Sequence, residues 1–521
     1  MRKLIIAILC AAAPAASFAG QWQILGTRPM GMGGAFVAVA QGPVAQYWNP
    51  AGLVKSSANV SGMEIPVDVS AEFTGDIAKN ASQIGDLAKT YQATQSAQQT
   101  RGAMNADQAA AFVKTLSLLS DMNKPGKGAL LDVAGGVDFK FSKVALSVNN
   151  FTSIGLNPFV DTTNVGLGTI GGSGSTGIDM SGVTATAPVG DPTLAAAATN
   201  IGTAIQTIGY GNLEKLICAS AGCLNGQTSG AITGYATLAN AFVNQAHNSG
   251  LSDAQIVQAA NTMTQYAGSV APIIANVVAH PGADYSNNTS NLNAVGASFT
   301  EIAAGYAWNL KMLRGLSLGA NLKMVNGQIA ETTFHFLSNS NTNDAFKMND
   351  IKSTWQPSAD LGLLWDMNQK YPKLPLHPRL GLVVRDINNP KFDTAFDGQY
   401  TLKRQARMGL ALNPAKFWTL AMDMDLSKNN TNVEGFDSRD LSMGTEINIV
   451  NRKAFNIPLR GGLIKNLAEK DSKVAYTLGT GINLLYMHLD VSAVASSDKT
   501  EIDGHTYPTK VGLAASFGLL F

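Results

Sequence analysis

Residues Thr509 to Phe521 read TKVGLAASFGLLF and give the clearest indication of the fold. Its odd positions are mostly apolar, as at Leu513 and Phe517, whereas its even positions are small or polar, as at Gly512 and Ser516. Side chains alternate between the two faces of a β-strand, so a period of two predicts a strand with one oily face.

The same alternation recurs at residues 316–324, 418–426 and 441–449, where the polar face carries Gly, Ser, Asn and scattered charges. A soluble β-sandwich also alternates, but its outward face is typically rich in Lys, Glu and Thr. A transmembrane barrel turns its oily face to lipid and its small or polar face to the lumen. The pattern therefore favours an all-β transmembrane barrel.

Similar segments along the chain predict about fourteen antiparallel strands, an even number as a single-chain bacterial barrel requires. They lie near residues 60–71, 129–141, 144–156, 296–310, 315–336, 351–367, 378–389, 401–413, 416–428, 439–450, 457–467, 473–485, 487–497 and 506–521.

The predicted connectors sort into two classes. Several that follow even-numbered strands are very short, at residues 142–143, 311–314, 414–415 and 486, although 368–377 fits this class less well. Most that follow odd-numbered strands are longer, at residues 72–128, 157–295, 337–350, 390–400 and 429–438. Short turns on one rim and long loops on the other are typical of periplasmic turns and extracellular loops.

The composition agrees with a membrane protein better than with a cytosolic enzyme. Only 14% of the 521 residues are charged, whereas soluble domains carry about a quarter. The 37 basic and 36 acidic residues nearly cancel, and no long basic run occurs, which argues against nucleic acid as a partner.

The N-terminus reads as an export signal covering residues 1–19. Arg2 and Lys3 precede an apolar run, and Ser17 to Ala19 gives the small-x-small pattern of a cleavage site. Cys10 could instead be a lipoprotein acceptor, but Leu9 stands where a small residue is expected. We predict a mature protein in the outer membrane of a Gram-negative bacterium.

A glycine-rich segment precedes the first strand. From Gly26 to Leu53 the chain reads GTRPMGMGGAFVAVAQGPVAQYWNPAGL, which is too short and irregular to be a domain. Dense glycines allow backbone to lie close against other backbone. We therefore predict a plug over residues 20–57, packed inside a barrel formed by residues 58–521.

Two insertions, near 72–128 and 157–295, carry helical patterns. The patterns lie near residues 105–122, 192–208, 230–248 and 252–279, the last with a capping box from Ser252 and Gln255. Such helices could cover the barrel mouth and bind an apolar guest, or could pack only on one another. The sequence favours neither alternative.

Charged residues on the predicted lumen face could form ion pairs or take part in chemistry. They are Lys323, Arg385, Arg407, Asp423, Asp425, Glu446 and Arg460. Asp423 and Asp425 share one face and could serve as acid and base, but lumen carboxylates more often neutralise arginines or hold a plug. No hydrolase, metalloprotease or phosphate-loop motif accompanies them, so we expect neither an enzyme nor a cofactor.

Cys218 and Cys223 are the two cysteines that follow the signal. In an oxidising compartment, close spacing of an even pair favours a disulfide over a metal site. His247 and His280 stand alone in helical patterns, so we expect no metal centre.

At the family level, the motif GMGGAF followed by YWNPAGL resembles the N-terminal plug of FadL-like outer-membrane barrels, which include fatty-acid transporters and PorV-type barrels. The segments GLSLGANLKMVNG at 315–327 and GLVVRDINNPKFD, QARMGLALNP and LAMDMDLSKNNT within 381–431 resemble the branch labelled conjugal transfer protein TraF. The resemblance covers the plug and about half of the barrel, but neither insertion.

This resemblance implies a fourteen-stranded barrel, a plug that acts as a hatch, and passage of hydrophobic molecules with lateral exit through the wall. The residues that match the plug motif are Gly31, Gly33, Gly34, Asn49, Pro50, Ala51 and Gly52. In the fatty-acid branch the third strand provides the exit. Here Gly155 and Pro158 could interrupt that strand's ladder, because proline lacks a donor and glycine weakens pairing.

Our sequence-based hypothesis is a non-enzymatic outer-membrane channel for fatty-acid-like or hydrocarbon molecules, gated by the plug. The alternative is a non-transporting scaffold of a secretion or conjugal transfer system, whose surface helices dock that machinery. Expected partners are outer-membrane lipid, a hydrophobic ligand and the barrel-assembly machinery. The last would read the C-terminal residues Phe517, Leu519 and Phe521.

Overall fold

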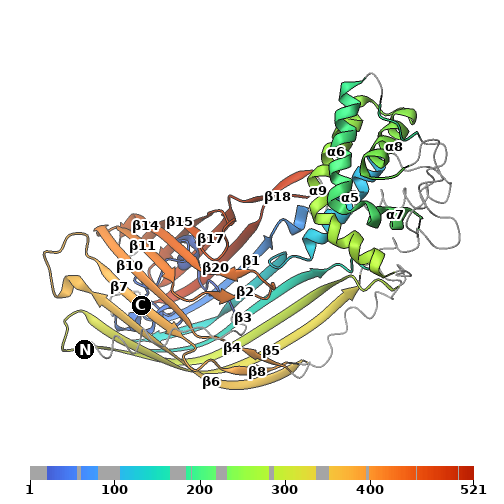
Figure 1. Cartoon of the computed structure of the whole chain (residues 1–521). Helices are drawn as coiled ribbons and strands as arrows, with labels where there is room; N and C mark the ends of the chain where they lie inside the picture. The colour runs from blue at the N-terminus through green and yellow to red at the C-terminus, as the bar shows by residue number, and fades with distance from the viewer. Residues whose placement is uncertain are drawn as a thin grey trace.

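The computed structural model of the chain shows a closed antiparallel barrel of fourteen strands (Figure 1). It describes residues 20–55, 60–79, 106–164, 184–188, 191–218, 232–280, 287–335, 351–394, 398–452, 455–502 and 504–521. Among these residues, no helix is both long and apolar enough to cross a membrane. The fold class predicted from the alternating segments is confirmed.

Each barrel strand overlaps one predicted segment. The strands are β1 (Gly62–Thr74), β2 (Gly128–Phe141), β3 (Val144–Phe159), β4 (Asn291–Asn309), β5 (Leu316–His335), β6 (Lys352–Asp366), β7 (Arg379–Arg385), β10 (Gln405–Ala415), β11 (Trp418–Asp425), β14 (Asp440–Arg452), β15 (Phe455–Asn466), β16 (Ala475–Leu484), β17 (Met487–Ser496) and β20 (Lys510–Leu520). The last strand, β20, pairs with β17 and β1 and closes the barrel.

The connectors separate onto two rims, as their lengths predicted. The β2–β3, β10–β11 and β16–β17 connections span two residues each and lie on one rim, which we term the short-turn rim. The connection from β6 to β7 is longer and contains the short helix η6 (Met367–Gln369). Every long insertion leaves from the opposite rim, termed here the long-loop rim.

The outward face of the wall carries exposed apolar side chains from almost every strand. These include Val67, Val69, Leu131, Val133, Leu146, Val148, Ile302, Leu322, Leu361, Leu410, Met422, Met443, Leu459, Leu478, Val491 and Leu513. Exposed aromatic side chains flank them toward the short-turn rim (Phe141, Tyr306, Trp308, Phe417, Tyr486, Phe521) and toward the long-loop rim (Phe73, Phe159, Trp355, Tyr476, Tyr507). An apolar band between two aromatic girdles is typical of a lipid-facing barrel surface.

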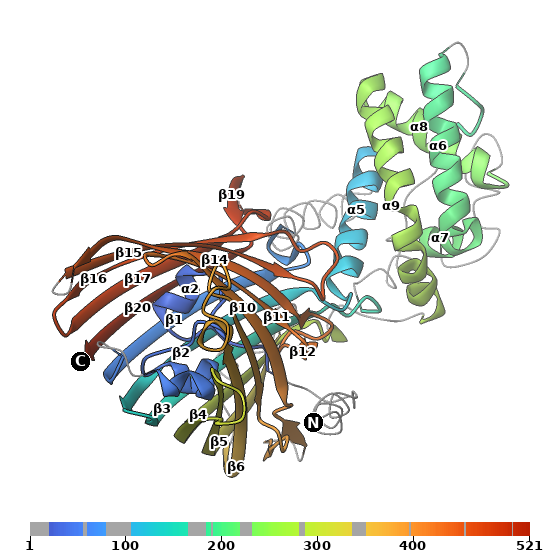
Figure 2. The ribbon, with the colours of Figure 1, turned by 90° about the vertical axis from the view of Figure 1, so that its left-hand side faces the viewer.

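The insertions form a helical bundle at the long-loop rim (Figures 1 and 2). Its helices are α5 (Ala106–Met122), α6 (Pro192–Ile208), α7 (Tyr210–Cys218), α8 (Tyr235–Asn248) and α9 (Asp253–Ala279). Four of them share one apolar core that contains Val113, Ile201, Leu238 and Ile256. Of the two alternatives, the described structure therefore favours helices that pack on one another. The predicted capping box of Ser252 precedes α9, whereas α7 was not predicted.

Two hairpins from the long-loop rim fold back toward the lumen. The first consists of β8 (Lys391–Asp393) and β9 (Gln399–Thr401), and buries Phe392 against Phe299 of β4 at a centroid distance of 5.1 Å. The second consists of β12 (Asn429–Asn430) and β13 (Asp437–Ser438), and its tip reaches β3. A third hairpin, β18 (Lys499–Ile502) with β19 (His505–Pro508), extends the β17–β20 connection.

The wall shows no opening at Gly155 and Pro158, contrary to the expectation for the third strand. Gly155 pairs with Leu130 and Val295, and Pro158 pairs with Leu292, without a register shift. Asn432 from the second hairpin also fills the space beside Gly155, since a Cβ there would lie 2.1 Å from its carbonyl oxygen.

Other prolines coincide with breaks in the ladder. Pairing of β1 with β2 passes over Ile65 and Pro66, and pairing of β15 with β16 passes over Ile457 and Pro458. The missing donor of proline explains both gaps. Proline does coincide with interrupted strand pairing in this barrel, but at Pro66 and Pro458 instead of at Pro158.

Candidate functional site

Residues 20–55 lie inside the barrel, where α2 (Thr27–Gly31), α3 (Ala45–Trp48) and the 3₁₀ helix η1 (Pro50–Val54) form a compact plug (Figure 2). Trp22, Phe36, Tyr47 and Trp48 pack edge to face or tilted at 5.6 to 6.1 Å between centroids. Tyr47 also stacks on Phe151 of β3 at 4.9 Å. The aromatic core joins the plug to the wall.

Glycines allow the first turn of the plug to touch the wall backbone. A Cβ on Gly33 would lie 2.7 Å from the carbonyl oxygen of Leu463, and its φ of +65° is also unfavourable for other residues. On the wall, a Cβ on Gly444 would lie 2.2 Å from the carbonyl oxygen of Met32. Plug and wall therefore meet backbone to backbone, a contact that side chains would prevent.

The other two glycines of the first plug motif, Gly31 and Gly34, occupy the same contact zone. A Cβ on Gly31 would lie 3.1 Å from Cβ of Arg460, and one on Gly34 would lie 3.2 Å from Oγ of Ser442. Both neighbours belong to wall strands. All three glycines of the first motif thus face the wall rather than the centre of the plug.

The Asn-Pro-Ala-Gly motif fixes the last turn of the plug. The side chain of Asn49 is fully buried, donates to the carbonyl oxygens of Val37 and of Leu363 on β6, each at 3.1 Å, and accepts the Ala51 N–H at 3.1 Å. Pro50 starts η1, and a Cβ on Gly52 would lie 2.4 Å from the Ala40 carbonyl oxygen. Asn49 therefore ties together two parts of the plug and the wall.

Asp423 of β11 anchors the middle of the plug. Its Oδ2 accepts the backbone N–H groups of Phe36 at 2.7 Å and Val37 at 2.8 Å. Arg407 lies 3.8 Å from Asp423 and 3.4 Å from Asp425, and all three side chains are buried. Asp425 accepts the Asp440 N–H of the wall and contacts no plug atom among the hydrogen bonds of the described residues. This arrangement fits the ion-pair alternative for the two aspartates.

A chain of ion pairs connects α2 to the wall. Arg28 donates to both oxygens of Glu446 at 2.8 Å, Arg460 donates to Glu446 at 2.8 Å, and Arg460 reaches Asp490 at 2.6 Å. Charge-assisted, bidentate contacts of this kind are directional as well as strong. They hold the first helix of the plug over β14, β15 and β17.

A second ionic cluster lies under the opposite side of the plug. The Nζ of Lys323 is 2.8 Å from Asp386, 3.0 Å from Asp360 and 3.3 Å from Glu301. Arg385 donates to both oxygens of Glu301 at 2.9 Å. Buried charges require such pairing because desolvation is costly.

Arg385 also joins this cluster to the aromatic core. Its guanidinium carbon lies 4.0 Å from the centroid of the Tyr47 ring. Burial raises the pKa of the Tyr47 phenol, with Arg385 opposing it, so the hydroxyl stays protonated and donates to the Gln23 carbonyl oxygen at 2.5 Å. Every lumen charge predicted from the sequence is therefore buried and in an ion pair.

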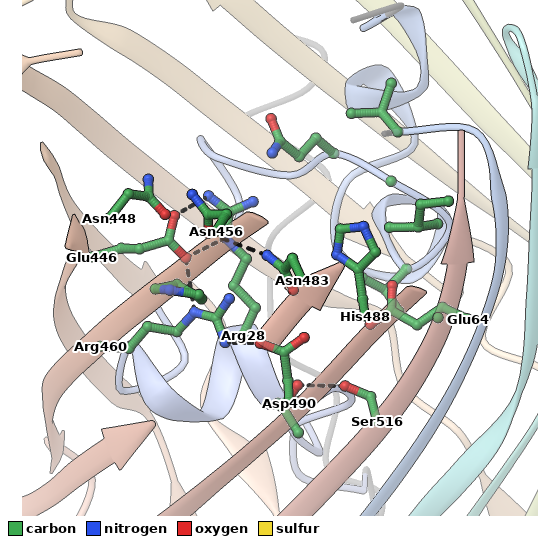
Figure 3. Close-up of a pocket in the computed structure, with 18 of the residues that line it drawn as sticks. Arg28, Glu64, Glu446, Asn448, Asn456, Arg460, Asn483, His488, Asp490 and Ser516 are labelled. Carbon is green, nitrogen blue, oxygen red and sulfur yellow. Dashed lines mark hydrogen bonds and ion pairs between the residues drawn. The ribbon is translucent and has the colours of Figure 1, made fainter. Parts of the chain in front are cut away.

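Between the plug and the short-turn rim lies a cavity of about 730 Å³, which we term the vestibule (Figure 3). Its lining combines charged and amide side chains with apolar ones: Arg28, Glu64, Glu446, Asn448, Asn456, Arg460, Asn483, His488, Asp490, Phe36, Val44, Val60, Leu485 and Leu520. On the other side of the plug, a cavity of only about 40 Å³ lies beside Gln21, Gln23 and Asp132. Of these two cavities, the one on the short-turn side is much the larger.

Sequence reasoning missed parts of this site and could not test others. Parity placed the charges on the lumen face and allowed Asp423 either to neutralise an arginine or to hold the plug, and in the structure it does both. Parity did not reveal that Glu64, His488 and Asp490 line a vestibule. Cys223 and the side chain of Cys218 lie outside the described residues, as does the signal at 1–19. Within the part of the chain that is described, no cluster of His, Cys, Asp and Glu is arranged to hold a metal.

Comparisons with known proteins give a family and distant structural likenesses. The family model described as "F plasmid transfer operon, TraF, protein" matches residues 46–425, which is 380 of the 521 residues. No curated protein matches the chain.

Three solved structures illustrate the distant likenesses. The Pseudomonas putida toluene transporter TodX is 10% identical, with 98% of this chain and 100% of that chain covered and a TM-score of 0.41. The Ralstonia pickettii toluene transporter TbuX is 11% identical, with 95% and 98% covered and a TM-score of 0.40. A Pseudomonas aeruginosa FadL homologue is 8% identical, with 96% and 98% covered and a TM-score of 0.38.

Proposed function

This chain belongs to the TraF family of the F plasmid transfer operon, and we propose that it is an outer-membrane channel for hydrophobic small molecules, closed by its N-terminal plug. The family match agrees with the narrower resemblance seen in residues 315–327 and 381–431. The word transfer in the family description does not by itself say what passes through the barrel.

The surface of the wall supports placement in an outer membrane. Exposed apolar side chains from almost every strand form a band, and aromatic side chains flank it on both rims, as with Trp308 and Trp355. In water this surface would expose far more contiguous apolar area than soluble proteins tolerate. The short-turn rim would then face the periplasm.

One observation carries the channel proposal: the plug fills a closed barrel, yet only non-covalent contacts hold it there among the described residues. Asp423, Glu446 and Asn49 bind it through hydrogen bonds and ion pairs. Such contacts can exchange with water or with a ligand. The vestibule provides space on the periplasmic side for a molecule that has passed the plug.

The apolar side chains in the lumen suit a hydrophobic solute better than an ion. Phe299, Phe392 and Tyr400 form a buried cluster near the long-loop rim, with centroid distances of 5.1 and 5.5 Å to Phe299. Deeper in the barrel lies the aromatic core of the plug around Trp48. Aromatic rings can hold both alkyl and aromatic guests by dispersion.

Uptake into proteoliposomes tests the proposal. We expect fatty acids or aromatic hydrocarbons to enter faster than in empty liposomes, and Asn49→Ala to increase the rate because it frees the plug from Leu363. Asn261→Ala on α9, far from the plug in sequence and exposed, is the matched control. If no apolar solute enters faster than in empty liposomes, the channel proposal fails.

A scaffold without transport is the second candidate. The observation that favours it is the helical bundle, which has its own apolar core and stands at the rim as a separate body (Figure 1). Such a bundle could dock secretion or transfer machinery. This candidate predicts that removal of the bundle abolishes assembly while solute flux is absent in every variant.

A further inference from the structure

A row of lumen-facing residues crosses the floor of the vestibule at one height. In the strand registers, Asn456 pairs with Asn483, and Asn483 pairs with His488 across the β16–β17 hairpin. His488 then pairs with Gly518, and Gly518 pairs with Glu64. In order along the wall the row reads Asn456, Asn483, His488, Gly518 and Glu64. Figure 3 shows the four side chains of this row around the cavity.

Gly518 leaves a slot in this row. Because it has no side chain, Glu64 and His488 face each other across it from strands two spacings apart, or roughly 10 Å of backbone. A Cβ at position 518 would meet its nearest neighbours at 3.5 to 3.7 Å, so ordinary side chains fit sterically there. The slot is therefore open space that a larger residue could fill.

The charges around the slot leave one carboxyl group, that of Glu64, without a paired cation. The two guanidinium groups of Arg28 and Arg460 are matched by Glu446 and Asp490 through the ion pairs described above. Within the described part of the chain, Glu64 has no hydrogen bond or ion pair. Its cross-strand neighbour on β2 is a further carboxylate, Asp138.

The remaining polar atoms at the slot can accept hydrogen bonds. The Oδ1 of Asn483 and the Nε2 of His488 are both buried and have no partner among the described residues. An imidazole nitrogen without a proton is an acceptor, as is an amide oxygen. An unpaired carboxyl group and two acceptor atoms suit a ligand that supplies N–H donors and a positive charge, because that positive charge would stabilise the ionised form of Glu64.

We propose that the vestibule binds a small organic cation, a primary ammonium group on an apolar stem. The ammonium occupies the slot over Gly518 and donates to Glu64, Asn483 and His488, while the stem lies against Phe36, Leu485 and Leu520. A cavity of about 730 Å³ is of ligand size. The proposal goes beyond channel function, because this site does not require the plug to open.

Titration calorimetry on the full chain in detergent tests the site, with n-hexylammonium as the probe and hexanoate as its anionic counterpart. At pH 9, where the alkylammonium is still protonated and the Glu64 carboxyl group is more fully ionised, we expect the ammonium to bind and hexanoate not to bind. Glu64→Gln should weaken binding by about tenfold or more, since a charge-assisted bond is lost. Glu501→Gln, an exposed carboxylate on the opposite rim, should leave the affinity unchanged.

A second variant tests whether the ligand occupies the slot, without changing any charge at the site. Gly518→Leu keeps every charge but occupies the slot, so it should abolish binding while the barrel still shows heat-modifiable migration on gels. The proposal is overturned if hexanoate binds more tightly than hexylammonium, or if Glu64→Gln and Gly518→Leu, both folded by the gel test, bind hexylammonium like the unaltered protein. Absence of solute flux in the uptake assay would leave this result untouched, because binding is measured with the plug in place.

Discussion

Replacing Asp423 with alanine should loosen the plug, because this wall residue accepts two hydrogen bonds from the plug backbone. Its Oδ2 is the acceptor for two buried N–H groups of the plug, those of Phe36 and Val37, at 2.7 and 2.8 Å. In Asp423→Ala both donors lose their partner while they remain away from water. The free energy that favours the seated plug over the lifted plug is therefore smaller in this variant than in the unaltered protein.

The magnitude follows from the cost of buried donors without acceptors. Each such group costs about 1–3 kcal/mol, so the two together cost about 2–6 kcal/mol. At 1.4 kcal/mol per factor of ten, the population with the local plug contacts open should rise by roughly thirtyfold at the lower bound. The arginine beside Asp423 adds to the effect, since it loses one of its two carboxylates.

Hydrogen exchange measures this opening directly, because amides exchange through local unfolding. The peptide that contains Phe36 and Val37 should exchange about thirtyfold faster or more in Asp423→Ala. Asp425→Ala is the matched control: it removes a carboxylate from the same arginine, but from a residue that bonds Asp440 of the wall rather than the plug. Equal protection of the plug peptide in Asp423→Ala and the unaltered protein would refute the reasoning.

Other changes test separate contacts. Gly33→Ala should prevent the plug from seating, because its Cβ would lie 2.7 Å from the Leu463 carbonyl oxygen, and protease should then cleave the plug in folded barrels. Lys323→Met leaves a group of buried carboxylates without their shared cation and should lower barrel stability by about 3–5 kcal/mol, seen as a lower midpoint of heat-modifiable gel migration. At the base of the helical bundle, burial alone would raise the pKa of Asp161, but its hydrogen bonds outweigh this and lower it. The carboxylate therefore stabilises the fold above its unfolded pKa of about 4, and the difference in thermal midpoint between the unaltered protein and Asp161→Asn should vanish as the pH falls through the lowered value.

Much of the barrel could be predicted because the features that define each strand and each connector can be read from neighbouring residues in the sequence. Alternation along each strand depends only on which side chains face lipid, so every barrel strand overlaps a predicted segment. Connector length depends on the chain alone, and it assigned the two rims correctly. The parity of Lys323 and Arg460 was enough to place them in the lumen.

What escaped prediction depends on which strands meet and on what fills the lumen. Glu64 and His488 lie near opposite ends of the chain, and only barrel closure through β20 brings them into one row. The hydrogen bond from the Phe36 N–H to Asp423 could not be predicted, because it depends on where the folded plug places Phe36 against the wall. Pro158 was expected to interrupt the wall, but the ladder gaps lie at Pro66 and Pro458, because the strand register decides which missing donor matters.

Several sequence predictions stay open, among them a disulfide and an assembly signal. The disulfide between Cys218 and Cys223 can be tested by thiol labelling of intact protein, where two reactive thiols without reductant would contradict it. The assembly role of Phe517, Leu519 and Phe521 also stays a prediction, although these residues lie on or directly after the strand that closes the barrel.

If the plug is the gate, it must move for solute to pass, and a reversible disulfide lock between plug and wall tests this movement. The hydroxyl groups of Thr27 on α2 and Ser516 on β20 are in hydrogen-bond contact, and both residues are buried. Cysteines at these positions place two sulfur atoms side by side, as a disulfide requires. The double variant is made with Cys218 and Cys223 replaced by serine, and its single variants serve as controls.

Solute uptake is then measured in the same proteoliposomes before and after reduction. We expect oxidation to stop uptake through the doubly substituted protein, reductant to restore it, and neither treatment to affect the single variants. Equal uptake in the oxidised and reduced states, with the cross-link verified by mass, would contradict the claim that the plug is the gate.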